Sequence, residues 1–352
     1  MGTVSSWWWC MNAEDGIDEI ANHATQVLQQ AGVPAAFRLE RLTGGGNNRV
    51  YRVESAAAAV VLKAYFRAAA DPRDRLRADY GFSAFSWSIG ARALPQPLAS
   101  DAAAGMAVYE FVAGGKLAAG EVTAAHAAEA AAFFHGVNEH RDEPRAAELP
   151  DASEACFSIA AHVACVDRRV ARLGDIDTAS PLGREAAEVV ARRIAPAWDR
   201  VGDSVLAAAG TAADEPLSPA DRCLSPSDFG FHNAIRAADG RLRFLDFEYA
   251  GWDDPAKMVC DFFCQPAVPV PREHLPVFVA SLAGLWESPS AFRRRVELLL
   301  PVYELKWCCI MLNEFLPAAD SRRTFAGAVA DQESRRTSQL AKVEAALDRT
   351  GA

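Results

Sequence analysis

The sequence has no long apolar run. Its 352 residues contain no stretch near the roughly 20 apolar residues that a membrane-spanning helix needs. The first residues, MGTVSSWWWCMN, carry no basic side chain and only a short apolar run, so they do not predict a secretory signal peptide. We therefore expect a cytoplasmic protein that has no membrane partner. The sequence gives no physical reason for the three consecutive tryptophans.

Positive charge is also scarce. The chain has 36 Lys and Arg against 46 Asp and Glu, which gives a formal net charge of −10. A nucleic-acid-binding protein needs basic side chains to neutralise phosphates, so we expect no nucleic-acid partner. Half of the residues are hydrophobic (51%), which predicts a folded globular protein and excludes a disordered one.

Two common motifs are missing. The eight cysteines include no C-x-x-C pair, so the zinc-ribbon spacing is absent, and the cysteines are expected as buried, reduced thiols. No G-x-S-x-G occurs, which argues against a hydrolase with a nucleophile elbow. His232 and His135 are isolated histidines, for which packing or a hydrogen bond is the commoner role.

Hydrophobic periodicity predicts a small sheet followed by many helices. An N-terminal helix is expected over 16–31, and strands over 37–42, 49–53, 58–65 and 106–112, with a helix over 71–89 between the last two. Further helices are expected over 121–139, 156–173, 184–208, 256–264, 273–286, 291–316 and 322–348. This order predicts an N-terminal extension and helix (1–34), a sheet-containing lobe (35–112) and a larger, mainly helical lobe (113–352), with Gly114-Gly115 as a hinge.

Residues 224–249 carry the residues most suited to chemistry. Two apolar runs, 233–236 and 242–247, flank an Asp239-Gly240 turn, which is a strong hairpin signal. Asp228 and Asn233 have the spacing D-x-x-x-x-N, and Asp246 ends the second run. Phosphoryl transfer from ATP uses one carboxylate at the acceptor hydroxyl, then an Asn and an Asp that hold Mg²⁺. An acidic surface hairpin without a metal is the alternative.

The N-terminal half offers residues for a nucleotide. The turn Gly44, Gly45, Gly46 lies between two strands and brings bare backbone close to a ligand, although an ordinary hairpin turn is the alternative. Lys63 ends an apolar strand and would need an anionic partner if buried; a solvent-facing lysine of an edge strand is the alternative. Asp79 follows on the next helix. Glu110 and Val112, at the end of a strand, offer backbone groups to an adenine ring.

Together these residues resemble the aminoglycoside phosphotransferase and choline kinase-like family. The similarity extends from about residue 37 to the last helices, and the span 224–261 is its most specific part. Within this span, LDFEYAGWDDP is particularly similar to the metal-aspartate segment of the family. The resemblance implies an α+β, two-lobed protein-kinase-like fold, with a small antiparallel-sheet N-lobe and a larger helical C-lobe. It also implies ATP and Mg²⁺ as cofactors and a small-molecule hydroxyl acceptor. Its roles are Asp228 as catalytic base, Asn233 and Asp246 as metal ligands, and Lys63, steadied by Asp79, at the α- and β-phosphates.

The chain departs from the pattern of that family before the catalytic aspartate. The family usually has His and a small residue there, and this chain has Pro226 and Ser227, so we expect a different brace for the loop. A protein kinase is disfavoured because no A-P-E-like segment follows Asp246. A pseudokinase or nucleotide-binding regulatory module without turnover is the alternative function.

The acceptor is not identified by the sequence. Glu304 and Trp307 lie three residues apart on one expected helix, hence on one face. With Glu248 and Tyr249 they are candidate substrate-binding residues, because acidic and aromatic groups bind a cationic head; Trp307 in the core is the alternative. The resemblance allows aminoglycoside- and choline-type acceptors. The sequence leaves the oligomeric state open.

Overall fold

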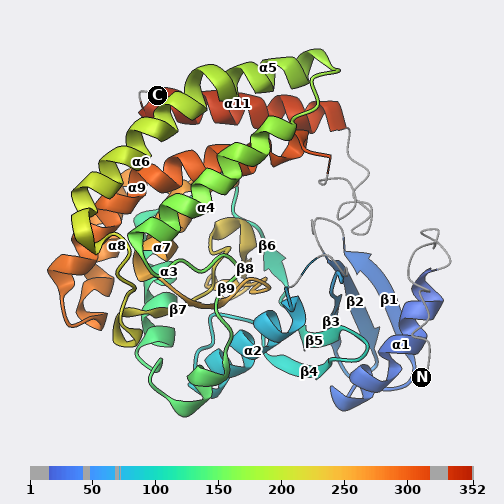
Figure 1. Cartoon of the computed structure of the whole chain (residues 1–352). Helices are drawn as coiled ribbons and strands as arrows, with labels where there is room; N and C mark the ends of the chain where they lie inside the picture. Colours follow the sequence, from blue (N-terminus) through green and yellow to red (C-terminus); the bar gives the residue numbers. More distant parts are fainter. Residues whose placement is uncertain (1–15, 43–47, 68–70, 72, 318–331, 351–352) are drawn as a thin grey trace, which may run out of the picture. The chain divides into compact units, whose positions relative to one another are not determined.

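The computed structural model describes residues 16–42, 48–67, 71, 73–317 and 332–350, and we refer only to these (Figure 1). They form two compact units. Of the described residues, the first unit contains 16–42, 48–67, 71 and 96–111, and the second contains 73–95, 112–317 and 332–350. The expected glycine turn Gly44, Gly45, Gly46 and the start of the expected last helix lie outside the described residues.

The first unit is an antiparallel sheet with one helix. Its strands are β1 (Phe37–Leu42), β2 (Arg49–Ser55), β3 (Ala59–Ala64), β4 (Pro97–Asp101) and β5 (Met106–Glu110), in the order β1-β2-β3-β5-β4. Helix α1 (Gly16–Gln30) packs with the sheet, burying Ala24, Val27 and Leu28 in one core with Val53 and Leu62. The structure confirms four expected strands. The sequence does not predict strand β4, because it begins at Pro97 and proline argues against a strand. β4 is an edge strand of the sheet, and a sheet tolerates proline at an edge.

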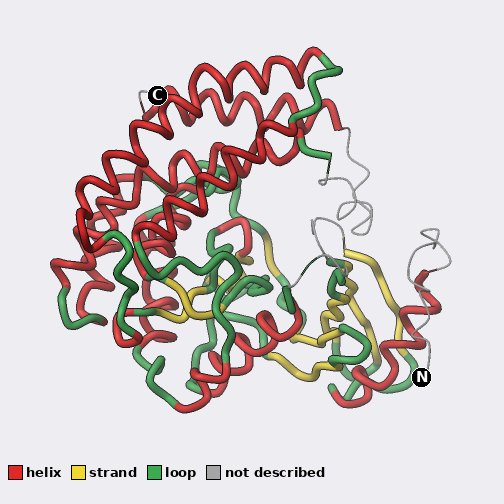
Figure 2. Tube along the Cα trace, in the orientation of Figure 1, coloured by secondary structure: helices red, strands yellow, loops and turns green. Residues whose placement is uncertain are grey.

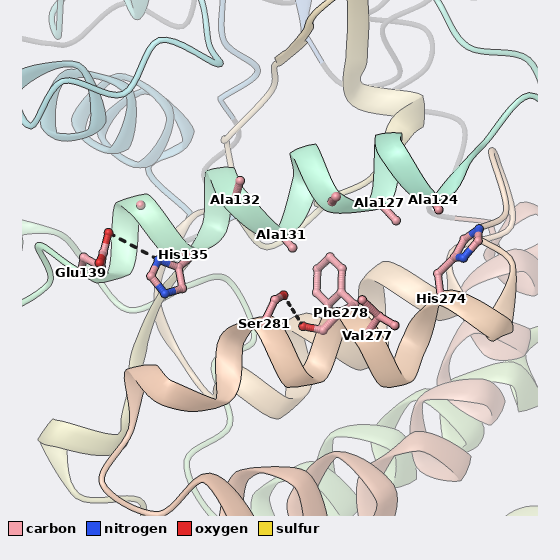
Figure 3. Close-up of a pocket in the computed structure, with 12 residues that line it drawn as sticks. Ala124, Ala127, Ala131, Ala132, His135, Glu139, His274, Val277, Phe278 and Ser281 are labelled. Carbon is pink, nitrogen blue, oxygen red and sulfur yellow. Dashed lines mark hydrogen bonds and ion pairs between the residues drawn. The ribbon is translucent and has the colours of Figure 1, made fainter.

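The second unit is mostly helical (Figure 2). Its helices are α2 (Arg75–Ser88), α3 (Ala124–Asn138), α4 (Ile159–Arg172), α5 (Pro181–Val189), α6 (Ala195–Ala209), α7 (Pro255–Cys264), α8 (Leu275–Leu282), α9 (Pro289–Leu312) and α11 (Gln332–Thr350). Helix α9 packs against α4, α6, α7 and α11 and is central to the core. The single helix expected over 184–208 is two helices, α5 and α6, joined by one π-helical turn, Val190–Ile194. Sequence periodicity does not reveal such a turn.

Five short strands complete the second unit. β8 (Ala234–Ala237) and β9 (Leu242–Phe244) form the expected hairpin, and β7 (Cys223–Ser225) pairs with β10 (Gly251–Asp253). Gly114-Gly115, expected as a hinge, instead forms β6 and pairs with β8. Gly114 is required there, because a Cβ at this position would lie 2.3 Å from the carbonyl oxygen of Arg236. Both glycines therefore belong to the second unit.

The two units divide the chain differently from the expected ranges. Helix α1 belongs with the sheet and not to a separate extension, because its apolar face is buried in the core of the sheet. Helix α2 was expected in the sheet lobe, and it belongs to the second unit. The reason is a pair of buried contacts described below, in which Arg75 and Asp79 bind residues that follow β9.

Two general properties follow from the described residues. None of the helices among them combines the length and apolarity required to span a lipid bilayer. All seven cysteines in the described part of the chain are free thiols, and six of them are buried, as the sequence predicts.

Candidate functional site

The loop between β7 and β8 presents Asp228. Ser227, directly before it, has a positive φ of 66°, which is uncommon for a residue other than glycine. The hydroxyl oxygen of Ser225 accepts a hydrogen bond from the Ser227 N–H (3.0 Å), and the Ser227 carbonyl accepts one from the Phe229 N–H (2.7 Å). Backbone strain of this kind persists where the surroundings enforce it, commonly at functional sites. Ser225 therefore supplies the different brace that the sequence led us to expect.

The strand that leads into this loop is itself fixed by a buried amide. Asn138, at the end of α3, donates through its side chain to the Leu224 carbonyl (3.0 Å) and accepts from the Leu224 N–H (2.8 Å). Asn138 has no exposed surface. The two reciprocal bonds satisfy both backbone groups of Leu224 and tie β7 to α3, so the loop starts from a rigid position.

The carboxylate of Asp228 is held on both oxygens. His232 lies 3.2 Å from Oδ1 through its Nε2, and the Asn233 side-chain nitrogen donates to Oδ2 (3.3 Å) and to the Asp228 carbonyl (3.0 Å). The Asp228 side chain is 36% exposed, so solvent or a ligand can reach it. The D-x-x-x-x-N spacing thus brings the carboxylate of Asp228 and the amide of Asn233 together, as the sequence predicts.

Asn233 and Asp246 lie at the same end of the β8–β9 hairpin. The Leu245 N–H donates to the Asn233 carbonyl (2.8 Å), one step beyond the Ala234–Phe244 pair in the ladder. Asp246 is the next residue and has a positive φ of 67°, so a second strained position occurs at this end of the hairpin. The hairpin therefore sets the separation of these two side chains.

These residues fit a magnesium ion. The side-chain nitrogen of Asn233 donates hydrogen bonds to Asp228. The side-chain oxygen Oδ1 of Asn233 is then the atom that can bind a hard cation. Mg²⁺ usually takes one or two protein oxygens and completes its shell with phosphate and water. The described residues contain no cluster of three His, Cys, Asp or Glu side chains suited to a metal, and a site of this kind does not need one.

Helix α2 contacts the segment after Asp246. The Asp79 carboxylate accepts from the Phe247 N–H (3.1 Å), and the Arg75 guanidinium pairs with Glu248 (3.4 Å), with both side chains almost fully buried. Glu248, which the sequence offers as a substrate ligand, is 3% exposed and is the ion-pair partner of Arg75. Its carboxylate is therefore not available to a substrate. The sequence missed Arg75, because its partner lies over 170 residues away.

Tyr249 also faces cations of this chain. Its ring centroid lies 5.6 Å from the Arg73 guanidinium and 5.9 Å from that of Arg75. Burial, reinforced by the charge of Glu248, raises the pKa of its hydroxyl, which therefore stays protonated at neutral pH. The aromatic face that we expected to bind a cationic substrate thus interacts with two guanidinium groups.

The other candidate substrate residues lie on α9. Glu304 pairs with Arg272 (2.6 Å), and Trp307 donates from its indole nitrogen to Asp261 (2.9 Å), which also accepts from Lys306 (3.1 Å). Glu304 and Trp307 are both partly exposed and share a face, as expected. Each carboxylate near Trp307 is nonetheless neutralised by a basic side chain, which weakens the expected attraction for a cationic ligand.

A buried network anchors the start of α7. Asp254 caps this helix by accepting from the Ala256 N–H (2.7 Å), and its other oxygen binds His162 (2.9 Å) and Arg295 (2.5 Å). Burial raises the pKa of the Asp254 carboxyl, but the His162 hydrogen bond and the Arg295 charge outweigh it, and the pKa falls to about 2. This network fixes the segment between the hairpin and α7.

Three candidate nucleotide-binding residues lie on β3, at the end of β5 and directly after β5. Lys63 is on β3, opposite Ala107, and is 7% exposed, so it is not the solvent-facing lysine of an edge strand. Glu110 exchanges hydrogen bonds with the Gln96 backbone: its N–H donates to Gln96 (2.8 Å) and its carboxylate accepts from it (3.1 Å). Val112 is the first residue of the second unit after β5.

Structural similarity to known proteins is extensive, although no protein-family model and no curated protein sequence matches. A spectinomycin phosphotransferase solved with ADP and spectinomycin has 11% identity and a TM-score of 0.59, covering 95% of this chain and 99% of that one. A choline/ethanolamine kinase family protein from Mesorhizobium loti has 18% identity and a TM-score of 0.57, covering 94% of each chain.

A choline kinase from Cryptosporidium parvum also has a similar fold. Its identity is 13% and its TM-score 0.55, covering 95% of this chain and 97% of that one. All three relatives are matched over nearly their whole length, with the antiparallel sheet and the helical remainder both included. The chain therefore has the α+β, protein-kinase-like fold that these small-molecule phosphotransferases share.

Proposed function

We propose that the protein is an ATP- and Mg²⁺-dependent kinase that transfers the γ-phosphate to a hydroxyl group of a small molecule. The observation that carries the proposal is the arrangement of Asp228, Asn233 and Asp246. The Asp228 carboxylate is held on both oxygens by the loop, and the residues Asn233 and Asp246 lie at the same end of the adjacent hairpin. This is the set of groups that phosphoryl transfer requires.

In the proposed reaction, Asp228 orients the acceptor hydroxyl and accepts its proton. The hydroxyl oxygen forms a bond to the γ-phosphorus, the bond from that phosphorus to the bridging oxygen breaks, and ADP leaves. Asn233 and Asp246 would hold the metal. When bound, Mg²⁺ neutralises charge on the phosphates. Holding the reactants in line supplies most of the acceleration in this class of reaction.

Residues of the sheet unit are proposed to bind the nucleotide. Lys63 would contact the α- and β-phosphates, and Gly44, Gly45 and Gly46, which lie outside the described residues, are further candidates for binding them. The backbone at Glu110 and Val112 would contact the adenine. Support for Lys63 comes from its burial on a central strand, where an ammonium group requires anionic partners.

The acceptor is proposed to be a small hydroxylated metabolite or antibiotic. The similar structures include enzymes named for choline, ethanolamine and spectinomycin, which all carry hydroxyl groups. A cationic head is not required, since Arg75, Arg272 and Lys306 neutralise the nearby carboxylates. The free thiols and the use of ATP are consistent with a cytoplasmic location.

An acceptor screen tests the proposal. Purified full-length protein with ATP and Mg²⁺ is assayed for ADP release over amino-alcohols, amino acids, sugars, aminoglycosides and spectinomycin. Acceptor-dependent ADP release and a phosphorylated product support a kinase. Stabilisation by ATP and Mg²⁺ with no transfer to any acceptor would support the nucleotide-binding module instead.

A further inference from the structure

His232 lies in the loop with Asp228, and neither the D-x-x-x-x-N spacing nor the expected metal ligands give it a role. Its Nε2 lies 3.2 Å from Oδ1 of Asp228, and its side chain is only 20% exposed. Asn233 holds the other oxygen of the same carboxylate (3.3 Å). Two neighbouring residues therefore bind the two oxygens of one carboxylate separately.

The chemistry of the pair determines the tautomer. An ionised carboxylate has no hydrogen-bond donor, so the imidazole nitrogen that faces it must carry the proton. The other nitrogen, Nδ1, is buried and has no hydrogen-bond partner among the described residues. In its neutral form, His232 thus carries the ring proton on Nε2 and donates a hydrogen bond from this nitrogen to Asp228.

Gly230 provides the space for this ring. A Cβ at position 230 would lie 2.8 Å from Nδ1 of His232, closer than side chains approach in proteins. Gly230 has an extended backbone (φ 172°), so conformation alone does not require glycine there. The requirement comes from the imidazole, which occupies the place that a side chain would take.

We propose that His232 is a positioning residue for phosphoryl transfer, which fixes the rotation of the Asp228 carboxylate. With Oδ1 bound by His232 and Oδ2 by Asn233, the plane of the carboxylate cannot turn freely. Its remaining lone pairs then point in a constant direction toward the acceptor hydroxyl. The inference rests on the proposed function, in which Asp228 is the base.

Three variants separate hydrogen bonding from packing. His232→Phe keeps an aromatic ring and removes the donor. His232→Gln restores a neutral donor close to the Nε2 position. Gly230→Ala leaves His232 in place and displaces its ring. The matched control is His140→Phe, because His140 also binds a carboxylate, that of Glu143 (2.8 Å), at an exposed site elsewhere on the fold.

Kinetics provide the first readout. We expect His232→Phe and Gly230→Ala to lower kcat by about 10- to 100-fold with the KM for ATP within about 2-fold, since misplacement of a catalytic group costs rate and not nucleotide affinity. His232→Gln should recover most of the rate, and His140→Phe should match the unchanged protein. In an Asp228→Ala background, His232→Phe should have no further effect. Equal losses in His232→Phe and His232→Gln, or the same loss in the Asp228→Ala background, would overturn the inference.

A second readout does not depend on turnover. In protein labelled with ¹⁵N-histidine, the His232 resonances should show the Nε2–H tautomer, and they should shift in Asp228→Ala. An Nδ1–H tautomer, or resonances insensitive to Asp228→Ala, would overturn the inference even in an active enzyme. If the expected tautomer is present and no acceptor is phosphorylated, the contact is real and the proposed function is wrong. His232 then has no positioning role in phosphoryl transfer.

Discussion

The carboxylate of Asp79 accepts a hydrogen bond from the backbone N–H of Phe247, 3.1 Å away. The two residues are 168 positions apart, and Phe247 directly follows Asp246. Helix α2 therefore holds the backbone of the segment that carries the proposed metal ligand. From the sequence we expected Asp79 to act on Lys63, and in the structure its carboxylate binds the Phe247 backbone.

Removal of this contact should destabilise the second unit. Asp79→Ala leaves a buried N–H without its acceptor, which costs about 1–3 kcal/mol. Asp79→Asn keeps an acceptor oxygen and should cost less. Urea unfolding gives the free energies, and Glu121→Ala is the control, because Glu121 accepts a backbone N–H at an exposed position. Equal stability of Asp79→Ala and the unchanged protein would show that the hydrogen bond is not important.

The strained turn before Asp228 predicts a loss of kcat when Ser225 is replaced and a gain of stability when Ser227 is replaced. Ser225→Ala removes the hydroxyl that binds the Ser227 N–H and should lower kcat by about 10-fold, since the loop loses its brace. Ser227→Gly relieves the positive φ and should stabilise the fold by up to about 1 kcal/mol. Thermal unfolding and steady-state kinetics measure both. A more active Ser225→Ala variant would contradict this account of the loop.

The Asp254 network predicts a loss of stability in acid. The pKa of Asp254 is about 2 in the folded protein against an ordinary value of 3.8. Because the folded pKa is lower, the network stabilises the fold above about pH 4, and this contribution of about 2 kcal/mol is lost as the pH falls toward about 2.

The comparison is with Asp254→Asn, which keeps the helix cap and removes the charge. The difference in unfolding free energy between this variant and the unchanged protein should shrink on acidification through that range. A difference that is constant with pH would show that Asp254 does not carry the effect.

The α9 residues predict how the acceptor binds. Trp307→Ala should raise the KM of the acceptor at least about 3-fold and leave the KM of ATP unchanged, because the indole is partly exposed beside Asp261. Glu304→Gln should change neither KM by more than about 2-fold, since Arg272 already neutralises Glu304. Equal effects of Trp307→Ala on both substrates would show that Trp307 has a structural role.

The sequence predicted those parts of the fold that depend on local patterns. Alternating apolar residues predict β1, β2 and β3, the Asp-Gly turn predicts the β8–β9 hairpin, and the apolar pattern over 256–264 predicts α7. The spacing of Asp228 and Asn233 was sufficient to place them together, because both lie within one short loop. Local spacing is the information that a single sequence contains.

Contacts between distant residues were not predictable. Local spacing gives no sign of the Arg75–Glu248 ion pair or of the Asp79–Phe247 hydrogen bond. Without the ion pair in view, Glu248 is a candidate substrate ligand. Strands β6, β7 and β10 have two or three residues each, too few for a pattern. From the sequence, Glu304 is a candidate ligand for a cationic head, because local spacing does not show its ion pair with Arg272, which lies 32 residues away.

The most direct test of the central claim compares the unchanged protein with Asp228→Asn. Each is given ATP labelled at the γ-phosphate, Mg²⁺ and the best acceptor from the screen, and ATP affinity is measured in parallel. The account predicts labelled acceptor with the unchanged protein and a kcat lower by about 10²–10⁴-fold with Asp228→Asn at similar ATP affinity. Equal transfer by both proteins would contradict it.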